Sequence, residues 1–539
     1  MSKALTQHTT ELDPRDPADI EDRLLEVEKF GVEHIPDEER KSRPLNLFFI
    51  LHGSCITFSL FIIGFFPLAF GLSWWASFSA VAVGSLAGGL LLAPMGLFGP
   101  RTGTNNPVTS GAHFGILGRL IGTFLEASFS LAFAALSIWT GGDALVSCLK
   151  AWVGVGDSTL LRVVCYGVLS VIVTVISVVG HDLMLRVQRF MIPTAGLFAI
   201  IGVFVFAGDF DSGYRGTHEY ALGTFWPTWI LSMILVLSTV TSYGSYAGDW
   251  SRHISRRFSD RSILTNMFLG GFLGMGLPIL WGAFTAAATF SAGTGNADTP
   301  YVFGLADLSP NWYLPLLLYL GLASGTAQAV INTYGTGLDT SSFIPRLTRI
   351  QATFVACAVA TILVYLGYFY SGIIDAVSTA LSLLACFSVS WIVAMIIGFV
   401  HRKGWYIQDD LQVFNRGEKG GRYWFHHGLN WRATGPWLFG TAVGMFGFTN
   451  TAWFTSPGSK WLDGADIGFA VSALITAVLY PIMLKAFPEP RNVFRDFYDE
   501  DPNEVFHRER LAAIATATPV PVPGGAPGAA LETAGEGAR

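Results

Sequence analysis

A series of apolar stretches, each about 20 residues long, runs through the chain and limits what it can fold into. A helix of about that length crosses the roughly 30 Å hydrocarbon core of a bilayer. In lipid, backbone polar groups must be bonded within the protein, which favours helices. The candidate spans are 46–70, 75–97, 120–147, 159–179, 188–207, 225–247, 264–291, 313–340, 352–370, 374–400, 433–454 and 467–487. The sequence therefore predicts an all-α integral membrane protein with about twelve transmembrane helices, embedded in a lipid bilayer.

Composition agrees with this prediction. The chain has 51% hydrophobic and 13% charged residues, whereas soluble domains carry about 25% charged residues. The net charge of −6 is modest and lies largely in the terminal segments, which gives no indication of a nucleic-acid partner. Five cysteines are scattered through apolar stretches without a CxxC spacing, so we expect small buried side chains and neither disulfides nor a metal site.

Basic residues alternate between the two sides of the predicted spans. With the N-terminus inside, the outer segments hold only Lys150, Arg162, Arg215 and Lys460, and the inner segments hold most other Lys and Arg residues. Lys and Arg accumulate in cytoplasmic loops of membrane proteins. The alternation supports the span count and predicts a multi-pass protein of the plasma membrane with both termini in the cytoplasm.

Two spans contain runs of small polar residues that could interrupt a helix. The first reads Gly53-Ser54-Cys55 followed by Thr57-Phe58-Ser59, and the sixth contains 238–245, STVTSYGS. Taken singly, such runs more often pack helices together. Their corresponding places in two halves five spans apart favour a pair of broken helices around a site, as in secondary transporters built from inverted repeats. A passive channel fits less well, because two interrupted helices in inverted halves favour alternating access. An integral membrane enzyme fits less well, because the histidines are dispersed.

Polar side chains also follow one face of the eighth span. Gln328, Asn332, Thr333 and Thr336 recur at helical spacing and could bind a small cation beside an unwound partner, or could form hydrogen bonds between helices. Ionisable residues inside spans are costly and indicate function. Glu126 lies inside the third span and is the functional candidate, whereas Asp249 with Arg252 and Asp339 with Arg346 are interpreted as structural or gating pairs.

Four ordered segments resemble the purine–cytosine permease branch of the nucleobase–cation symporter-1 family. They are 27–40 (VEKFGVEHIPDEER), 99–119 (GPRTGTNNPVTSGAHFGILGR), 247–253 (AGDWSRH) and 331–338 (INTYGTGL). The resemblance implies a leucine-transporter-like fold with two inverted five-helix repeats and two peripheral helices. It divides the chain into a cytoplasmic N-terminal tail (1–44), a first repeat (45–210), a second repeat (211–403), helices 11 and 12 (404–487) and a largely disordered cytoplasmic C-terminal tail (488–539).

The same resemblance implies uptake of a purine or pyrimidine base coupled to Na⁺ or H⁺, with no resident cofactor. The implied substrate positions, with Glu126 added as the intramembrane candidate, are Ser59, Phe61, Glu126, Phe133, Thr239, Val240, Ser242 and either Gln328 or Ala329. The implied cation positions are Thr57, Asn332 and Thr333. The oligomeric state is left open.

Two positions depart from the family pattern. The stacking tryptophan expected in the third span falls on Phe133, and the basic residue often found before Phe114-Gly115 falls on Gly111. Phenylalanine stacks with less surface than tryptophan, which leaves the substrate open to bases other than cytosine. The alternative is a carrier of the same fold for allantoin, a hydantoin, a vitamin or an amino acid. Aromatic faces at Phe58, Phe61, Phe133 and Tyr243 favour a flat heterocycle over an amino acid.

Overall fold

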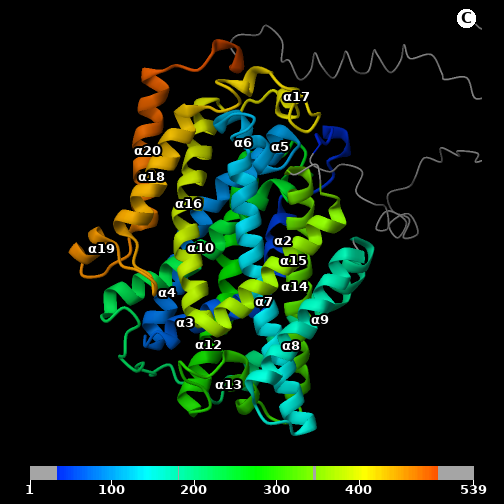
Figure 1. Cartoon of the computed structure of the whole chain (residues 1–539), viewed down its shortest axis with the longest axis vertical. Helices are drawn as coiled ribbons and strands as arrows, with labels where there is room; N and C mark the ends of the chain where they lie inside the picture. Colours follow the sequence, from blue (N-terminus) through cyan, green and yellow to red (C-terminus); the bar gives the residue numbers. More distant parts are fainter. Residues whose placement is uncertain (1–32, 180, 344–346, 496–539) are drawn as a thin grey trace, which may run out of the picture.

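The computed structural model describes residues 33–179, 181–343 and 347–495, which form helices and three isolated β-bridges. The first half of the bundle contains α2 (Leu45–Ser54), α3 (Phe58–Ala69), α4 (Trp74–Leu92), α5 (Phe98–Thr102), α6 (Asn106–Phe114), α7 (Leu120–Val153), α8 (Thr159–Val179) and α9 (His181–Phe206). The second half contains α10 (Phe225–Ser251), α11 (Asp260–Leu269), the π-helical turn η3 (Gly270–Met275), α12 (Gly276–Ala292), α13 (Tyr301–Leu308), α14 (Leu314–Phe343), α15 (Arg349–Leu366) and α16 (Ile373–His401). The chain continues through α17 (Gln408–Leu411), α18 (Trp431–Phe448), α19 (Pro457–Trp461) and α20 (Gly468–Ala486) (Figure 1).

Most of these helices are long and apolar. Among the described residues, nine helices could each cross a membrane, and α2 with α3 forms a tenth crossing if the two are taken together. Within the described part of α9, the apolar stretch Pro193–Phe206 is shorter than a full span, and α18 is 18 residues long. The prediction of an all-α membrane protein is confirmed, while the count of twelve spans stays a prediction.

Glycines let the central helices pack closely. A Cβ added to Gly325 of α14 would lie 2.9 Å from the carbonyl oxygen of Ser137 in α7. A Cβ on Gly64 of α3 would lie 2.6 Å from the backbone nitrogen of Ala283 in α12. Small residues at such crossings allow the backbones of membrane helices to approach and gain dispersion contacts. The high glycine content therefore serves the centre of the bundle, where α3, α7, α12 and α14 lie.

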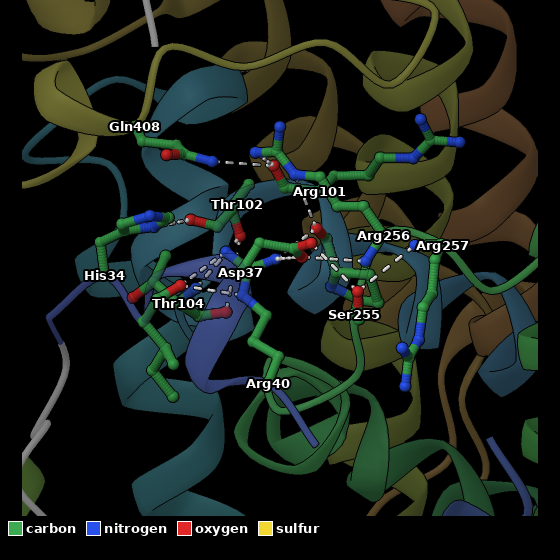
Figure 2. Close-up of polar contacts among 12 residues, drawn as sticks. His34, Asp37, Arg40, Arg101, Thr102, Thr104, Ser255, Arg256, Arg257 and Gln408 are labelled. Atoms are coloured by element: carbon green, nitrogen blue, oxygen red, sulfur yellow. Dashed lines mark hydrogen bonds and ion pairs between the residues drawn. The ribbon is translucent and has the colours of Figure 1, made fainter. Parts of the chain in front are cut away.

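The segment before α2 is bonded to the bundle, although the sequence predicted only a soluble tail there. Arg40 is 3% exposed, and its guanidinium donates to the carbonyls of Ile35 at 2.7 and 2.8 Å and of Pro100 at 2.8 Å. The N–H of Ile35 donates to the carbonyl of Gly103 at 2.9 Å. Figure 2 shows Arg40 and Asp37 between the α5 region and the loop that follows α10.

Asp37 makes the contacts to that second loop. Its carboxylate accepts hydrogen bonds from the Ser255 hydroxyl and the Arg256 N–H, both at 3.0 Å (Figure 2). Burial alone would raise the pKa of Asp37, but these two hydrogen bonds and the charges of Arg40 and Arg256 lower the pKa below its usual value. Residues 35–42 therefore tie two loops together.

The segment after α20 is also bonded to the bundle. Glu489 accepts a hydrogen bond from the Arg402 guanidinium at 2.7 Å and one from the Asn430 side chain at 2.8 Å. The side chains of Arg402 and Glu489 are 1% and 0% exposed. Arg402 also donates to the carbonyl of Ala112 in α6 at 2.7 Å. The first residues of the predicted C-terminal tail thus close the end of the bundle that carries α5, α6 and α17 (Figure 1).

Candidate functional site

The first span is broken near its middle. α2 ends at Ser54, α3 begins at Phe58, and the two helices differ in direction by 73°. Gly, Ser and Thr have low helix propensity. Thr57, between the two helices, adopts an extended conformation and is the N-cap of α3. A helix end leaves backbone carbonyls without partners inside the helix. The carbonyl of Leu51 accepts from the Ser54 hydroxyl and that of His52 from the Cys55 N–H, so part of this helix end is bonded locally.

A small pocket lies at this break. In this conformation its enclosed part has room for about one water molecule. The broken span, α9 and α14 supply its walls: Gly53, Ser54, Ile56, Thr57, Ala195, Ser324, Ala327, Gln328 and Ile331. The α14 residues recur every three or four positions and therefore share one helix face. The first span and the eighth thus meet around a polar cavity.

Hydroxyl and amide groups converge on the pocket. The Cys55 thiol donates a hydrogen bond to the Tyr243 hydroxyl of α10 at 3.5 Å, and Ser54 and Gln328 lie close enough to that hydroxyl to interact with it electrostatically. The Ser324 hydroxyl accepts from the N–H of Phe58 at 3.4 Å, which ties α14 to the first turn of α3. This arrangement can offer donors, acceptors and one aromatic ring to a small polar heterocycle.

Oxygen atoms at the break provide ligands of the kind that small cations bind. Thr57 Oγ1 lies 2.8 Å from the Ser59 hydroxyl, and Thr57 lines the pocket beside Gly53 and Ser324. Both Thr57 and Ser59 are buried. Of the substrate and cation positions implied by the sequence, Thr57 and Gln328 line this pocket, and Ser59 is bonded to it through Thr57.

The candidates of the third span lie on one face of α7. Glu126 and Phe133 are 3% and 5% exposed, and Ser130 between them bonds the Tyr246 hydroxyl of α10. The Tyr246 hydroxyl also donates to the backbone carbonyl of Glu126 at 3.0 Å. Spacings of three and four residues place Glu126, Ser130 and Phe133 on the same side of the helix, facing α10.

Aromatic rings continue this contact along α10. Tyr243 lies 5.8 Å from Trp250 and 6.0 Å from Tyr246, measured between ring centroids. Tyr243 bonds the break in the first span, and Tyr246 bonds α7. One face of the sixth helix therefore connects the pocket to the Glu126 region.

Several predicted residues point elsewhere. Phe61 packs on Trp281 of α12 with a centroid distance of 4.3 Å. Val240 packs against Gly88 of α4. The Thr333 hydroxyl bonds Ser177 of α8 at 2.8 Å and its own helix at Ala329, so Thr333 faces α8 and not the break in the first span. Asn332 is 8% exposed and also lies outside the pocket lining.

The predicted interruption of the sixth span is wrong. α10 is an unbroken α-helix from Phe225 to Ser251. Its hydroxyl groups bond carbonyls of the preceding turn, as in Thr239 to Leu235 at 2.8 Å and Ser242 to Thr239 at 2.7 Å. Ser and Thr commonly satisfy themselves in this way inside membrane helices. The polar run therefore accompanies a continuous helix, and only the first span of the predicted pair is broken.

Two predicted pairs near the inner span ends have different outcomes. Asp249 and Arg252 lie on the last turn of α10 and directly after it, where both take part in polar interactions. The side chains of Asp339 and Arg346 lie outside the described residues, so their pairing stays a prediction.

Four residues that line the pocket were not predicted from the sequence: Ile56, Ala195, Ser324 and Ala327. Ser324 precedes Gln328 by one helical turn, and this spacing could have identified it once Gln328 was chosen. Ala195 carries no functional group, and its only signal is its small size. Tyr243 was recognised as an aromatic face, but its hydroxyl contacts with two other spans could not be derived from spacing.

Comparison with known proteins places this geometry in context. Residues 34–472 match the sequence model of a family described as "Permease for cytosine/purines, uracil, thiamine, allantoin". A Bacillus subtilis relative named "Putative purine-cytosine permease YxlA" is 23% identical over 88% of this chain and 99% of its own length. An allantoin permease of Saccharomyces cerevisiae is 22% identical over 86% of this chain and 77% of its own length.

Solved structures show the same fold. The inward-facing conformation of Mhp1 has a TM-score of 0.67 at 18% identity and matches 88% of this chain and 96% of that one. Mhp1 is described as a nucleobase-cation-symport-1 family transporter, and its closed form with bromovinylhydantoin bound gives a TM-score of 0.64 at 17% identity, over 85% of this chain and 96% of that one. A Na⁺-coupled sialic acid symporter gives 0.52 at 12% identity, over 84% and 92%. The leucine-transporter-like fold expected from the sequence is confirmed.

Proposed function

Because the chain belongs to the family of permeases for cytosine/purines, uracil, thiamine and allantoin, we propose that it imports a purine or pyrimidine nucleobase by alternating access, driven by a coupled Na⁺ or H⁺. The chain is a multi-pass membrane transporter with a small-molecule substrate and a cation as partners. The assignment of a nucleobase as the substrate is supported chiefly by the pocket at the break of the first span, where Gln328, Tyr243 and Ser54 lie close together.

A nucleobase suits the chemistry of this pocket. Its ring edge alternates hydrogen-bond donors and acceptors, and a side-chain amide such as Gln328 can both donate and accept. Its flat face can stack on an aromatic ring, and Tyr243 and Phe133 supply rings on the two helices beside the break. A pocket that closes around a stacked base leaves no room for a ribose, so we expect nucleosides to be excluded.

The coupled cation is proposed at the same break. Thr57 and Ser324 carry hydroxyl oxygens of the kind that can bind Na⁺, and both residues line the pocket beside the end of α2. Concentrating a base a hundredfold costs about 2.7 kcal/mol. One positive charge that moves down 100 mV supplies about 2.3 kcal/mol. A single cation with its own gradient would therefore be sufficient.

The membrane and the orientation are part of this proposal. A nucleobase importer works at the plasma membrane, and the alternation of basic residues places both termini in the cytoplasm. The contacts of Asp37 with Arg256 put the N-terminal segment beside the basic 252–261 loop, in agreement with that orientation.

A carrier for allantoin or another heterocycle is the second candidate. The Saccharomyces cerevisiae relative is an allantoin permease that covers most of this chain, and allantoin also presents an alternating donor and acceptor edge. Allantoin has no flat aromatic face, so it gains less from Tyr243 and Phe133.

Uptake measurements test the proposal. The chain is expressed in cells that lack their own base transporters, and uptake of radiolabelled cytosine, adenine, guanine and hypoxanthine is measured in the presence of unlabelled bases, nucleosides, allantoin, hydantoin, thiamine and amino acids. We expect bases to compete and nucleosides not to compete. Replacing Na⁺ with choline at fixed pH, and varying pH at fixed Na⁺, identifies the driving ion. Best competition by allantoin or by an amino acid would reject the nucleobase assignment.

A further inference from the structure

The inner half of the broken span rests on an unusual partner. Leu51 and His52, on the last turn of α2, pack against η3, the π-helical turn inside the seventh span. A Cβ on Gly270 would collide with Leu51, and a Cβ on Gly274 would lie 3.3 Å from the backbone nitrogen of His52. Glycine at both positions is therefore what lets α2 lie directly on the backbone of the seventh span.

One side-chain hydrogen bond joins these two elements. His52 Nδ1 lies 2.9 Å from the carbonyl oxygen of Gly274. A carbonyl can only accept, so Nδ1 carries the proton in this contact. The ring of Phe48, one turn earlier, lies parallel to the His52 ring with centroids 5.9 Å apart and holds its orientation. The seventh span thus receives its bond from a ring that is itself fixed on α2.

The His52 hydrogen bond reaches the seventh span at its π-helical turn. A π-turn changes the hydrogen-bond register of an α-helix, and such turns are rare and occur mostly at functional sites. Buried carbonyls without a donor are costly, most of all in a membrane. Gly274 follows Leu273 within the turn, and the His52 ring supplies a donor to it from outside the helix. α2 therefore helps to stabilise the irregular part of the seventh span.

The opposite side of the same turn contacts two further spans. A Cβ on Gly271 would lie 3.0 Å from Cα of Gly89 in α4 and 3.2 Å from a methyl carbon of Val240 in α10. Val240 was implied as a substrate residue, and its packing against Gly271 and Gly88 gives it a structural place. The π-helical turn is thus in contact with the first, second and sixth spans at one level of the bundle.

His52 is adjacent to the pocket. Gly53 and Ser54 follow it directly and form part of the pocket wall, and Cys55 then bonds Tyr243. Any tilt of α2 away from the π-helical turn would displace this wall. Because α2 is separated from α3 by a 73° break, it can tilt without moving α3.

We propose that His52 is a positioning residue that clasps α2 to the π-helical turn of the seventh span and so holds the inner wall of the pocket in place. This role rests on the proposed transport function, because the His52 contact matters when the pocket opens to the cytoplasmic side. α2 and the π-helical turn keep the pocket closed on that side while the His52 hydrogen bond is made. Its release frees α2 to tilt.

Cys55 provides a built-in reporter for this role. It is a free thiol, buried at the break, and a membrane-permeant maleimide reaches it only when α2 moves. The labelling rate is measured on the purified full chain in lipid nanodiscs without substrate, after the other four cysteines are replaced by alanine. We expect His52→Leu to raise the rate about fivefold, the population shift that loss of one neutral hydrogen bond produces.

Two further variants make the effect specific. His52→Asn places an amide N–H close to the position of Nδ1 and should return the rate to within about twofold of the parent protein. Asn46→Ala is the matched control, because it removes a hydrogen bond on the same half-helix, to Ser42 at 3.0 Å, without touching the seventh span. Equal rates in His52→Leu and Asn46→Ala would overturn the proposal.

Gly274→Ala probes the clasp from the other side. It keeps the carbonyl but presses a methyl group against α2, and should raise Cys55 labelling in a protein that retains His52. If His52→Leu does not fold, this variant decides alone, and an unchanged rate rejects the clasp. Labelling requires no substrate. If His52→Leu labels faster while the parent protein with His52 takes up no base, the clasp stands and the substrate assignment fails.

Discussion

Gln328 of α14 and Tyr243 of α10 come from two helices of the second half of the bundle and lie close to each other at the broken first span. An amide beside a phenol can satisfy two adjacent atoms on the edge of a base. Neither side chain carries a charge, so recognition here depends on hydrogen-bond geometry and on the exclusion of water. In such a site, a polar atom of the ligand that finds no partner loses its hydrogen bonds to water, and this weakens binding.

Replacing Gln328 by alanine tests that role. The variant leaves the edge of a bound base without its partner, and we expect binding to weaken by about 1–3 kcal/mol. Equilibrium binding of radiolabelled base to the purified protein measures the change. Thr326→Ala is the control, because its hydroxyl bonds the Leu322 carbonyl within the same helix. A similar loss in both variants would assign the effect to disruption of α14.

Glu126 is the residue whose role is hardest to derive from type alone. It is 3% exposed, on the α7 face that meets Tyr246. Glu126→Gln keeps the size and an acceptor but cannot titrate. If Glu126 carries the coupling proton, the variant exchanges base across a vesicle membrane but does not accumulate it against a gradient. Weakened binding at every pH would instead indicate a direct substrate contact, and wild-type behaviour in both assays would leave only a structural role.

Residue types predicted which positions in the spans are polar, but not the direction of each side chain. Gln328 and Thr333 are five residues apart on α14, which corresponds to different helix faces, and the structure places one at the pocket and the other against α8. The family resemblance implied that both residues belong to the substrate and cation site. Which helix faces the break is a property of packing among several spans, and no spacing in one span contains it.

At the scale of helices, runs of small polar residues in two spans have different structures. The polar run of the first span is broken, and the polar run of the sixth is a continuous helix. In α10 each hydroxyl can bond a carbonyl in the preceding turn, and Ser238 reaches the Leu381 carbonyl of α16 at 2.7 Å. In the first span, the chain turns where α14 and α10 supply Ser324 and Tyr243 as outside partners. Local composition permits a break, and neighbouring helices decide whether it forms.

The eighth span offers a prediction about the coupled cation. Ser324 lines the pocket at the break, whereas Thr333 bonds Ser177. We expect Ser324→Ala to raise the cation concentration needed for half-maximal uptake at least about twofold, because a single ligand hydroxyl contributes about 0.5–1.5 kcal/mol. Thr333→Ala should leave this concentration unchanged. By reciprocity, Ser324→Ala should also weaken the effect of the cation on base affinity. The opposite ranking would return the cation to the Asn332–Thr333 pair.

At the scale of the whole molecule, hydropathy and loop charge predicted the bundle well, because lipid imposes length and helicity on every span. They did not predict how the ends of the chain bind. Arg40 and Glu489 lie outside the spans in polar segments that look like solvated tails, yet both are buried. Their partners, Pro100 and Arg402, are distant in sequence, so the contacts become visible only when the bundle is assembled.

The buried pair of Arg402 and Glu489 should be important for stability. Glu489→Ala leaves the Arg402 guanidinium buried without its counter-charge, and removing one partner of such a pair costs about 3–5 kcal/mol. Thermal unfolding in detergent should therefore begin at a clearly lower temperature. Asp409→Ala breaks an exposed pair with Arg416 at 2.6 Å and should cost at most about 1 kcal/mol. Equal shifts in the two variants would show that Glu489 has no special role.

Orientation in the membrane follows from the alternation of basic residues and can be tested on the intact cell. Both ends of the described chain lie beside α5, α6 and α17, and α13 lies at the opposite end of the bundle (Figure 1). If the basic end is cytoplasmic, single cysteines at the exposed positions Gly213 and Asn296 should react with an impermeant maleimide added outside. A cysteine at exposed Glu418 should react only after permeabilisation. These variants are made in a chain whose own cysteines are alanine, so that each signal has one source. The reverse pattern would show that the protein has the opposite orientation in the membrane. External labelling at all three positions would show that the number of spans is wrong.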